Sequence, residues 1–411
     1  MTHEWRTATL GELTRLSMGR TPARANRAYW DPERNTGNAW VSIADLSRSE
    51  GGVVDDTKEY LSDAGAELVP EVESGTLLLS FKLSLGKLAF AGRDLRTNEA
   101  IAALPIARPD LILKEYLYYF LESVDWASVA GVDAKVKGRT LNKKTLSALP
   151  ITFPESLAEQ ERIVRILDEA LDAIDTAQAN TRANIDNTDA LFLAYLKNLF
   201  ANPGADWHFK TVDQLADRCL GKMLDRAKNR GEPKPYLRNF NVRWFDFDLS
   251  DVSSMKFLES EADRYRVQDG DVVVCEGGYP GRAAVWSGSS IYFQKALHRV
   301  RFTEPALSWW FVYYLYFADA TGTLRDHFTG TGISHFTGKA LGRFSLPVPE
   351  LNELRDTLEG IHELRSQCTQ LARQQANQLQ VLDRLRRSAL QDAIETGLQS
   401  AASRASERQS E

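Results

Sequence analysis

The stretch KKTLSALPITFPESLAEQERI, Lys143–Ile163, joins a short apolar run closed by Pro154 to the beginning of a helical pattern. The stretch GKALGRFSLPVPELNELRDTL, Gly338–Leu358, has the same arrangement 195 residues later. In both, proline ends a run of strand length, and polar residues with a Leu/Ile stripe follow at once. The chain therefore contains one strand-to-helix junction twice, which predicts a duplicated fold.

Further matches extend this repeat in both directions along the chain. At the offset of 195 residues the matched segments are Gly75–Ser80 with Gly270–Cys275, Gly86-Lys87 with Gly281-Arg282, and Tyr118-Tyr119 with Tyr313-Tyr314. Near the start of each half the offset is 202 residues, where Trp5 matches Trp207 and Gly19 matches Gly221. The change of offset indicates a length difference in loops, which vary more than the elements they connect.

Each copy is predicted to be a mixed α/β domain, over residues 1–154 and 204–350. Short apolar runs bounded by Gly and Pro are typical of strands. They are Leu77–Ser80, Leu88–Ala91, Ile101–Leu104, Val272–Cys275, Ala283–Trp286 and Leu297–Phe302. An aromatic helix is expected after the strands of each copy, at Lys114–Leu121 and at Leu307–Ala318.

After each copy the apolar pattern changes to steps of three and four residues, which predicts a heptad seam. The first seam is Ile163, Leu167, Ala170, Ile174, Ala177, Thr181, Asn184, Thr188, Leu191, Tyr195 and Leu199. The second is Leu351, Leu354, Leu358, Ile361, Leu364, Cys368, Leu371, Gln375, Leu379, Leu382, Leu385 and Ala389. We expect long helices over 155–203 and 351–398 that pair as an antiparallel coiled coil, followed by a disordered tail at 399–411. The alternative is that each helix packs only on its own domain. The predicted fold class is α+β: two pseudo-repeated mixed α/β domains separated by two long helices.

Composition excludes several classes of protein. Apolar residues make up 43% and aromatic residues 10%, as in ordinary folded domains. The polar stretch Met1–Glu12 lacks the apolar core of a secretory signal, and no apolar run is long enough to span a bilayer. Cys219, Cys275 and Cys368 are odd in number and far apart, so we expect reduced thiols in a cytoplasmic protein. The net charge of −6 does not exclude DNA, because a balanced domain can still present one basic face.

Several longer segments resemble the specificity subunit of Type I restriction–modification systems, from Trp5 to about Leu398. The segments are LSMGRTPARANRAYW (Leu16–Trp30), AWVSIADL (Ala39–Leu46), LPITFPESLAEQERIVRIL (Leu149–Leu167), GKMLDRAKNRGEPKPYLRNFNVRWFDFDLSD (Gly221–Asp251) and GDVVVCEGGYPGRAAVW (Gly270–Trp286). The resemblance implies two target-recognition domains, each of which reads one half of a bipartite site in double-stranded DNA. It also implies that the helices serve as spacer and docking platform for two adenine-N6 methyltransferase subunits, which translocating endonuclease subunits join. S-adenosylmethionine is expected in the methyltransferase subunit and no cofactor in this chain.

The docking residues implied by the resemblance lie where the helices begin, at Glu159, Gln160, Ile163 and Leu351. The repeat departs from itself here, because Leu354-Arg355 stands in the second copy where the first has Glu159-Gln160. We therefore expect the second helix start to be less regular than the first.

Cations in Gly- and Pro-containing loops are the candidate DNA contacts, because guanidinium and ammonium groups pair with phosphates or with guanine edges. With Thr21, the candidates are Arg20, Arg24, Arg27, Lys87, Lys135, Lys137, Arg139, Lys222, Arg226, Lys228, Arg230, Arg238, Arg243, Arg282 and Lys339. The alternative is that these loops are basic and solvated. The paired tyrosines Tyr118-Tyr119 and Tyr313-Tyr314 are expected in the core rather than stacked on bases.

Signals for catalysis are weak. DHFTGTG, Asp326–Gly332, fits a loop with which adenine methyltransferases hold S-adenosylmethionine, but no Asn/Asp-Pro-Pro-aromatic tetrapeptide accompanies it. The six histidines are scattered without metal-ligand spacing. We therefore expect a non-catalytic subunit. The alternatives are a coiled-coil interaction scaffold and, less favoured, a self-sufficient DNA methyltransferase.

Overall fold

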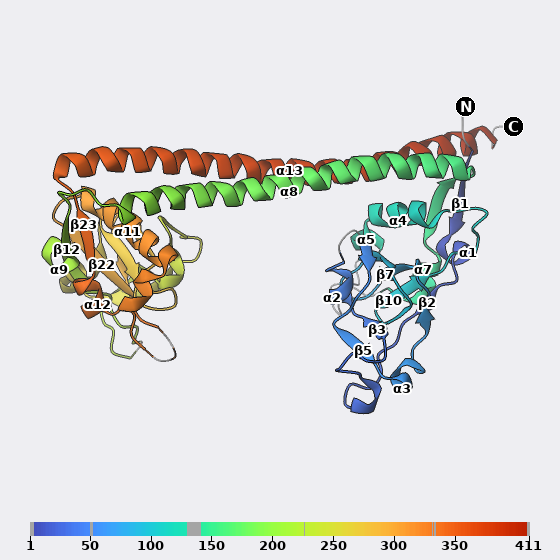
Figure 1. Ribbon diagram of the computed structural model, residues 1–411, viewed down its shortest axis with the longest axis horizontal. Helices are drawn as coiled ribbons and strands as arrows, with labels where there is room; N and C mark the ends of the chain where they lie inside the picture. The colour runs from blue at the N-terminus through green and yellow to red at the C-terminus, as the bar shows by residue number, and fades with distance from the viewer. Residues whose placement is uncertain are drawn as a thin grey trace. The chain divides into compact units, whose positions relative to one another are not determined.

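The computed structural model describes residues 4–49, 52–129, 141–225, 227–330, 332 and 334–408, with only the backbone for residues 395–408. Internal contacts divide the chain into two units. Unit 1 comprises residues 1–180 and 378–411, and unit 2 comprises residues 181–377. Each unit consists of one α/β globule and one segment of each of the two long helices, α8 (Leu157–Ala201) and α13 (Leu351–Arg408) (Figure 1).

The described residues of unit 1 form three sheets. One pairs β1 (Trp5–Thr9) with β11 (Pro150–Pro154). The second has the order β2 (Ser17–Met18), β10 (Ile101–Leu104), β7 (Leu77–Ser80), β8 (Leu88–Ala91) and β4 (Val53–Val54). The third has the order β5 (Glu59–Leu61), β3 (Asn38–Val41), β9 (Leu95–Thr97) and β6 (Glu71–Val72). The helices described are α1 (Leu10–Leu13), η1 (Arg27–Tyr29), α2 (Ile43–Leu46), α3 (Asp63–Ala66), α4 (Lys114–Ser123), α5 (Trp126–Val129) and α7 (Lys143–Ser147).

Unit 2 repeats this arrangement, except that its second sheet has no counterpart of β4 and a small hairpin is added. Its sheets are β12 (His208–Thr211) with β23 (Ser345–Val348); β13 (Ala216–Leu220), β22 (Leu297–Phe302), β19 (Val272–Cys275) and β20 (Ala283–Val285); β17 (Ser253–Phe257), β14 (Glu232–Leu237), β21 (Ile291–Phe293) and β18 (Arg266–Val267); and β15 (Val242–Arg243) with β16 (Asp246–Phe247). Its helices are α9 (Val212–Leu215), η3 (Asn239–Asn241), η4 (Glu259–Glu261), α10 (Ala262–Tyr265), α11 (Ala306–Thr321), η5 (Thr323–His327) and α12 (Gly338–Arg343).

The duplication extends to individual residue pairs. Arg6 faces Phe153 in the first sheet of unit 1, and His208 faces Val348 in unit 2, at the offsets of 202 and 195 residues predicted from the sequence. In the next sheet Ile101 faces Ser80, and Leu297 faces Cys275, at offsets of 196 and 195 residues. The third sheet pairs Trp40 with Arg96 in parallel, as its counterpart pairs Tyr236 with Tyr292. Because a slip of one residue would turn every side chain to the other face of the sheet, this agreement confirms a true repeat.

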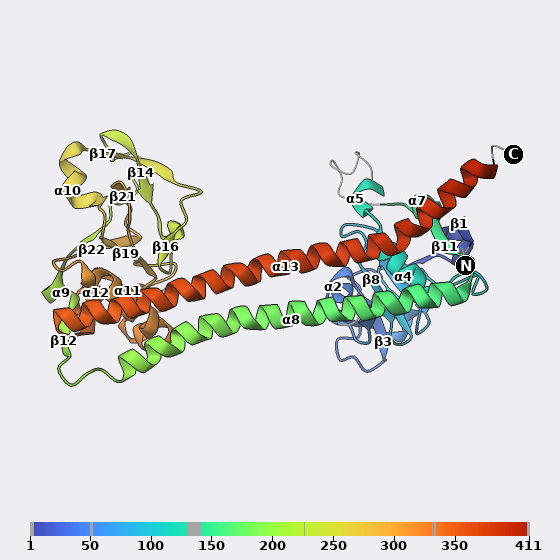
Figure 2. The same cartoon turned by 90° about the horizontal axis from the view of Figure 1, so that it is seen from above.

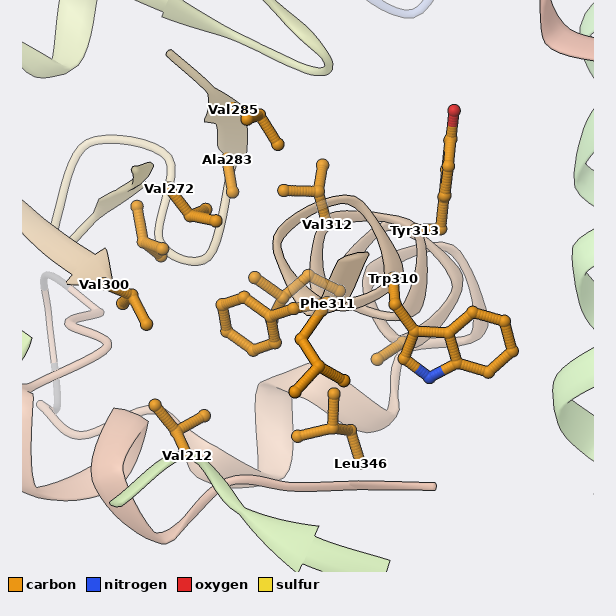
Figure 3. Close-up of a cluster of buried hydrophobic side chains, with 14 of the residues drawn as sticks. Val212, Val272, Ala283, Val285, Val300, Trp310, Phe311, Val312, Tyr313 and Leu346 are labelled. Atoms are coloured by element: carbon orange, nitrogen blue, oxygen red, sulfur yellow. The ribbon is translucent and has the colours of Figure 1, made fainter. Parts of the chain in front are cut away.

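The core of each globule lies between its sheets and its aromatic helix. In unit 2 the side chains of Val272 and Val300 meet Phe311 of α11, and Trp310 lies beside Leu346 (Figure 3). Tyr313 is fully buried in this cluster, and Tyr314 packs against it half-buried. Tyr118 and Tyr119 pack half-buried against the corresponding cluster of unit 1. The prediction that these tyrosines belong to the core is confirmed.

Within each unit the two long helices run antiparallel, as both views of the ribbon show (Figures 1 and 2). In unit 1 the Gln178 amide donates to the Asp383 carboxylate at 2.7 Å, and Arg386 donates to Asp175 at 2.6 Å. Rising numbers on α8 thus meet falling numbers on α13. The predicted α+β fold class, with two mixed α/β domains and two long helices, is confirmed. The helix α13 continues to Arg408, so the predicted helix end at 398 and the disordered tail after it are corrected up to that residue.

The predicted seam of α8 is buried at Ile163, Leu167, Ile174 and Thr181 but fails at Ala170 and from Asn184 onward. Leu171 is buried in place of Ala170, and Phe192, Leu196 and Phe200 are buried while Leu191 is 56% exposed. An α-helix drifts from a strict seven-residue repeat, and the aromatic face of α8 is taken up by the globule of unit 2. The Phe200 ring lies 5.1 Å from the Trp310 ring of α11. This end of α8 therefore packs on its own globule as well as on α13.

Candidate nucleic-acid interface

The loop that begins at β2 in unit 1 and at β13 in unit 2 leaves its sheet at the same place in both. The Gly19 N–H donates to the Ile101 carbonyl at 3.1 Å, and the Gly221 N–H donates to Leu297 at 3.0 Å. A Cβ atom on Gly19 would lie 2.2 Å from the Thr97 carbonyl oxygen, so only glycine fits. This close approach explains why both copies keep glycine before their basic loops.

The cationic residues after these two glycines differ in whether their charge is exposed to solvent or paired within the protein. Arg20 is exposed, and its side chain makes no hydrogen bond or ion pair with any described residue. Lys222 is only 8% exposed, and its ammonium donates to Glu261 at 2.5 Å and to the Lys256 carbonyl at 3.0 Å. The Lys222 charge is therefore neutralised inside unit 2 and is not presented to a ligand in this structure.

Arg24 is held by its own domain. Its guanidinium forms a two-point ion pair with Glu59, with Nη2 at 3.0 Å from Oε2. The same group lies 4.1 Å from the ring centre of Trp30 and 4.7 Å from that of Trp40. Such cation–π contacts with two indoles orient the guanidinium and tie the loop to the third sheet. The Thr21 hydroxyl likewise donates to Glu99.

A cavity of about 540 Å³ lies against this arrangement. Arg24, Arg27, Trp30, Lys58 and Tyr60 line it together with Asp31, Pro32 and Glu59. Arg27 is exposed and makes no side-chain hydrogen bond or ion pair within the described ranges. Lys58 is exposed beside it and was not predicted, because a single lysine between Thr57 and Glu59 carries no pattern. Arg27 and Lys58 are thus cations that a polyanion can approach.

The predicted cations of unit 2 are mostly paired internally. Their partners, with the distances that join them, are Asp251 for Arg238 at 2.9 Å, Asp248 for Arg243 at 3.0 Å, the Asn239 carbonyl for Arg282 at 3.0 Å, Asp225 for Lys228 at 3.7 Å and the Ala227 carbonyl for Arg230 at 2.6 Å. Exposed ion pairs contribute little to the stability of the fold, so a phosphate can replace the carboxylate as the partner of such a cation. Lys87 and Lys339 are exposed, and no described residue forms an ion pair or hydrogen bond with either side chain. Lys135, Lys137, Arg139 and Arg226 lie outside the described residues.

A second cavity, of about 740 Å³, opens in unit 2 between the β19–β20 loop and the segment after α11. Tyr279, Arg282 and Arg325 line it with Trp244 and Asp319. Burial raises the pKa of the Asp319 carboxyl above its usual value, and the neighbouring Arg325 opposes this rise. Arg325 is exposed. It was not predicted as a site residue, because it lines this cavity only through the position of the β19–β20 loop, which is far away in the sequence.

Three of the four predicted docking residues are buried inside unit 1, where they contact their own globule, and their docking role stays a prediction. Gln160 is fully buried: its amide donates to the carbonyls of Leu111 and Pro154, each at 2.8 Å, and accepts from the Leu113 N–H at 2.9 Å. Glu159 and Ile163 are also buried. The Pro-Glu junction joins α8 to α4 and β11, which is a structural role. Leu351 is exposed at the start of α13.

The described residues contain no group of three or more His, Cys, Asp or Glu side chains that could hold a metal ion. Within the same ranges, no helix has both the length and the apolar content that a membrane span requires. Burial raises the pKa of the Cys275 thiol to about 12, which makes it an unreactive core residue.

The fold and its loops define a duplicated α/β protein with two long helices and cations displayed on corresponding loops. Comparison with known sequences finds that the family model of the Type I restriction modification DNA specificity domain matches residues 2–187. The resemblance predicted from the sequence is thereby confirmed. No curated protein matches the chain.

Solved structures show the same fold over nearly the whole chain. One belongs to a structural description of the complex assembly and conformational transition of the type I R-M system. Its TM-score is 0.76 at 17% identity, with 96% of this chain and 99% of that chain covered. Another is the HsdS subunit from Thermoanaerobacter tengcongensis, with a TM-score of 0.55, 18% identity and coverage of 95% and 96%. The likeness therefore includes unit 2, which the family match does not reach.

Proposed function

We propose that this chain is the DNA-recognition subunit of a Type I restriction–modification complex. Each globule reads one half of a bipartite site in double-stranded DNA, and the long helices space the two halves. The chain itself carries out no chemistry. Methyltransferase subunits that bind S-adenosylmethionine dock on the helices and methylate adenine N6, and translocating endonuclease subunits complete the complex.

The observation that carries this proposal is the repeat in strand register between units 1 and 2. A repeated frame presents equivalent loops twice, which suits a ligand with two similar half-sites. The family of residues 2–187 supports DNA as that ligand. Exposed cations at Arg20, Arg27 and Lys87 supply groups for phosphate contacts in unit 1.

The proposed docking of methyltransferase subunits has support from the helices. Apolar side chains are exposed on both, at Ile166, Leu191, Leu371, Val381 and Leu385. Exposed apolar residues on long helices suit a partner that packs its own helices against them. These positions replace the buried Glu159, Gln160 and Ile163 as the proposed docking surface.

The test combines the full chain with Type I methyltransferase subunits and a library of random DNA duplexes. We expect selection of a split sequence, binding that weakens log-linearly with salt, and methylated adenines in both halves of the selected site. Binding that ignores salt would support the interaction scaffold instead. Labelled S-adenosylmethionine retained by the chain alone would support a self-sufficient methyltransferase.

A further inference from the structure

The loops that join β7 to β8 and β19 to β20 have the same backbone frame. In unit 1 the N–H groups of Phe81 and Gly86 donate to Ala100 and Ser80, each at 2.9 Å. In unit 2 the corresponding N–H groups of Glu276 and Gly281 donate to Ala296 at 2.8 Å and to Cys275 at 2.9 Å. A Cβ atom on Gly86 would lie 2.2 Å from the Trp126 ring, and one on Gly281 would lie 2.4 Å from Leu324. Residues 81–87 and 276–282 are therefore one rigid turn, built twice.

Both turns present a large apolar side chain to solvent. Leu83 is 72% exposed and Tyr279 is 62% exposed, which makes them the two most exposed large hydrophobic side chains in the described part of the chain. They belong to different units, yet they lie one position apart in the aligned turns. A single exposed apolar side chain is ordinary, but its recurrence in one rigid turn of both units makes the turn tip a candidate binding position.

The backbone at Leu83 adds an independent argument. Leu83 has a φ of 63°, and the aligned residue of unit 2, Gly278, has a φ of 78°. Leucine is disfavoured in this left-handed conformation, whereas glycine adopts it freely. The chain therefore keeps a strained leucine with its side chain in solvent, where glycine would stabilise the fold. Strain of this kind is typical of functional positions.

The charges beside the two tips favour nucleic acid over an apolar protein partner. Lys82 and Lys87 flank Leu83, and the segment 81–87 contains no acidic residue. In unit 2 the Arg282 guanidinium lies 4.0 Å from the ring centre of Tyr279. The single acid of that turn, Glu276, is half-buried at its base. An apolar tip between cations suits a groove that has phosphates on both sides and bases at its floor.

We propose that Leu83 in unit 1 and Tyr279 in unit 2 make apolar contacts with the bases of their respective half-sites, while Lys82 and Lys87 beside Leu83 meet the phosphates and Arg282 holds the Tyr279 ring in place. This inference rests on the proposed DNA-recognition function and assigns the base-contacting position within it. Apolar side chains contact thymine methyl groups or wedge between base steps in known modes of DNA recognition.

The test uses the full chain with methyltransferase subunits and the duplex selected by the unaltered protein. Leu83→Gly and Leu83→Asn both remove the apolar tip and tolerate the left-handed backbone. Each is expected to weaken binding by about tenfold, the cost of one mismatched base pair, and to remove discrimination at one half-site only. Tyr279→Ala is expected to do the same at the other half-site. The salt dependence stays unchanged because no charge is lost, and the melting temperature does not fall.

Phe209→Ala is the matched control, because Phe209 is an exposed aromatic residue on β12, outside both turns. It should leave affinity and discrimination unchanged. Wild-type-like binding and discrimination in both Leu83 variants would overturn the inference and leave the DNA-recognition function standing. Unchanged DNA binding with loss of the methyltransferase subunits would overturn it in favour of a protein contact. A wild-type complex that binds no duplex would overturn the proposed function itself.

Discussion

Replacement of Gln160 by alanine is expected to destabilise unit 1 by about 3 kcal/mol. The fully buried Gln160 amide has three backbone partners, the Leu111 and Pro154 carbonyls and the Leu113 N–H, at 2.8 to 2.9 Å. A buried polar group without a partner costs about 1–3 kcal/mol, and alanine would leave three such groups. Water that enters the vacated space keeps the sum near the lower end of the range. The assay is hydrogen exchange of peptides from β11 and the first turns of α8, where opening should become about a hundredfold more frequent.

The repeat offers a matched control for this variant. Arg355 stands where unit 1 has Gln160, but its side chain is exposed and makes one ion pair, with Glu304 at 3.1 Å. Arg355→Ala should therefore cost less than about 1 kcal/mol. If both variants changed hydrogen exchange to the same small extent, the argument that Gln160 fastens α8 to its globule would be refuted.

Two further predictions concern pH and salt. Burial lowers the pKa of His298 from 6.5 to about 4. As the pH falls, this histidine is therefore protonated in the unfolded chain before it is protonated in the folded chain. The stability that it contributes is fully present above about pH 6.5 and falls by about 3 kcal/mol as the pH drops to 4. Urea unfolding of unit 2 across this range should show the loss in the wild type and not in His298→Gln; equal pH dependence in both would contradict the assignment. Arg20→Ala combined with Arg27→Ala should reduce the slope of log affinity against log salt by about 1.8, because two phosphate contacts disappear. An unchanged slope would mean that neither side chain contacts a phosphate; Arg24 is left intact because it supports Trp30 and Trp40.

The repeated frame could be predicted from the sequence because it depends on local signals. The predicted strands at Leu77–Ser80, Ile101–Leu104 and Val272–Cys275 have the observed bounds. Apolar runs of this length between glycines leave few alternatives for the backbone. The glycines at 19 and 221 marked positions where only a hydrogen fits between backbone segments.

The availability of the candidate cations could not be predicted, because it depends on partners far away in the sequence. Lys222 pairs with Glu261, 39 residues further along, and Arg24 pairs with Glu59. A sequence pattern shows that a loop is basic, but not which of its charges the fold neutralises. The same reason applies to Gln160, whose partners lie in a segment that no local pattern connects to α8.

The heptad seams show a third kind of error. The pattern at Leu191 and Tyr195 is a valid helical stripe, and both residues are exposed nonetheless. The neighbouring stripe through Phe192 and Phe200 buries larger rings against α11. Since burial of apolar area scales with side-chain size, the aromatic stripe takes the inner face. The predicted coiled-coil positions Leu191 and Tyr195 are thereby left exposed.

The two units share a backbone frame but differ in the side chains that this frame presents. Gly19 and Gly221 make the same backbone contacts, yet the next residue is a free Arg20 in unit 1 and an internally paired Lys222 in unit 2. The turns at 81–87 and 276–282 likewise share a frame, with a free Lys87 in one and a bonded Arg282 in the other. Substitutions at these positions change charge and shape without disturbing the hydrogen bonds of the sheet. Under the proposed function, a frame of this kind would let the two units recognise different half-sites, with exposed cations in unit 1 and an aromatic side chain in unit 2.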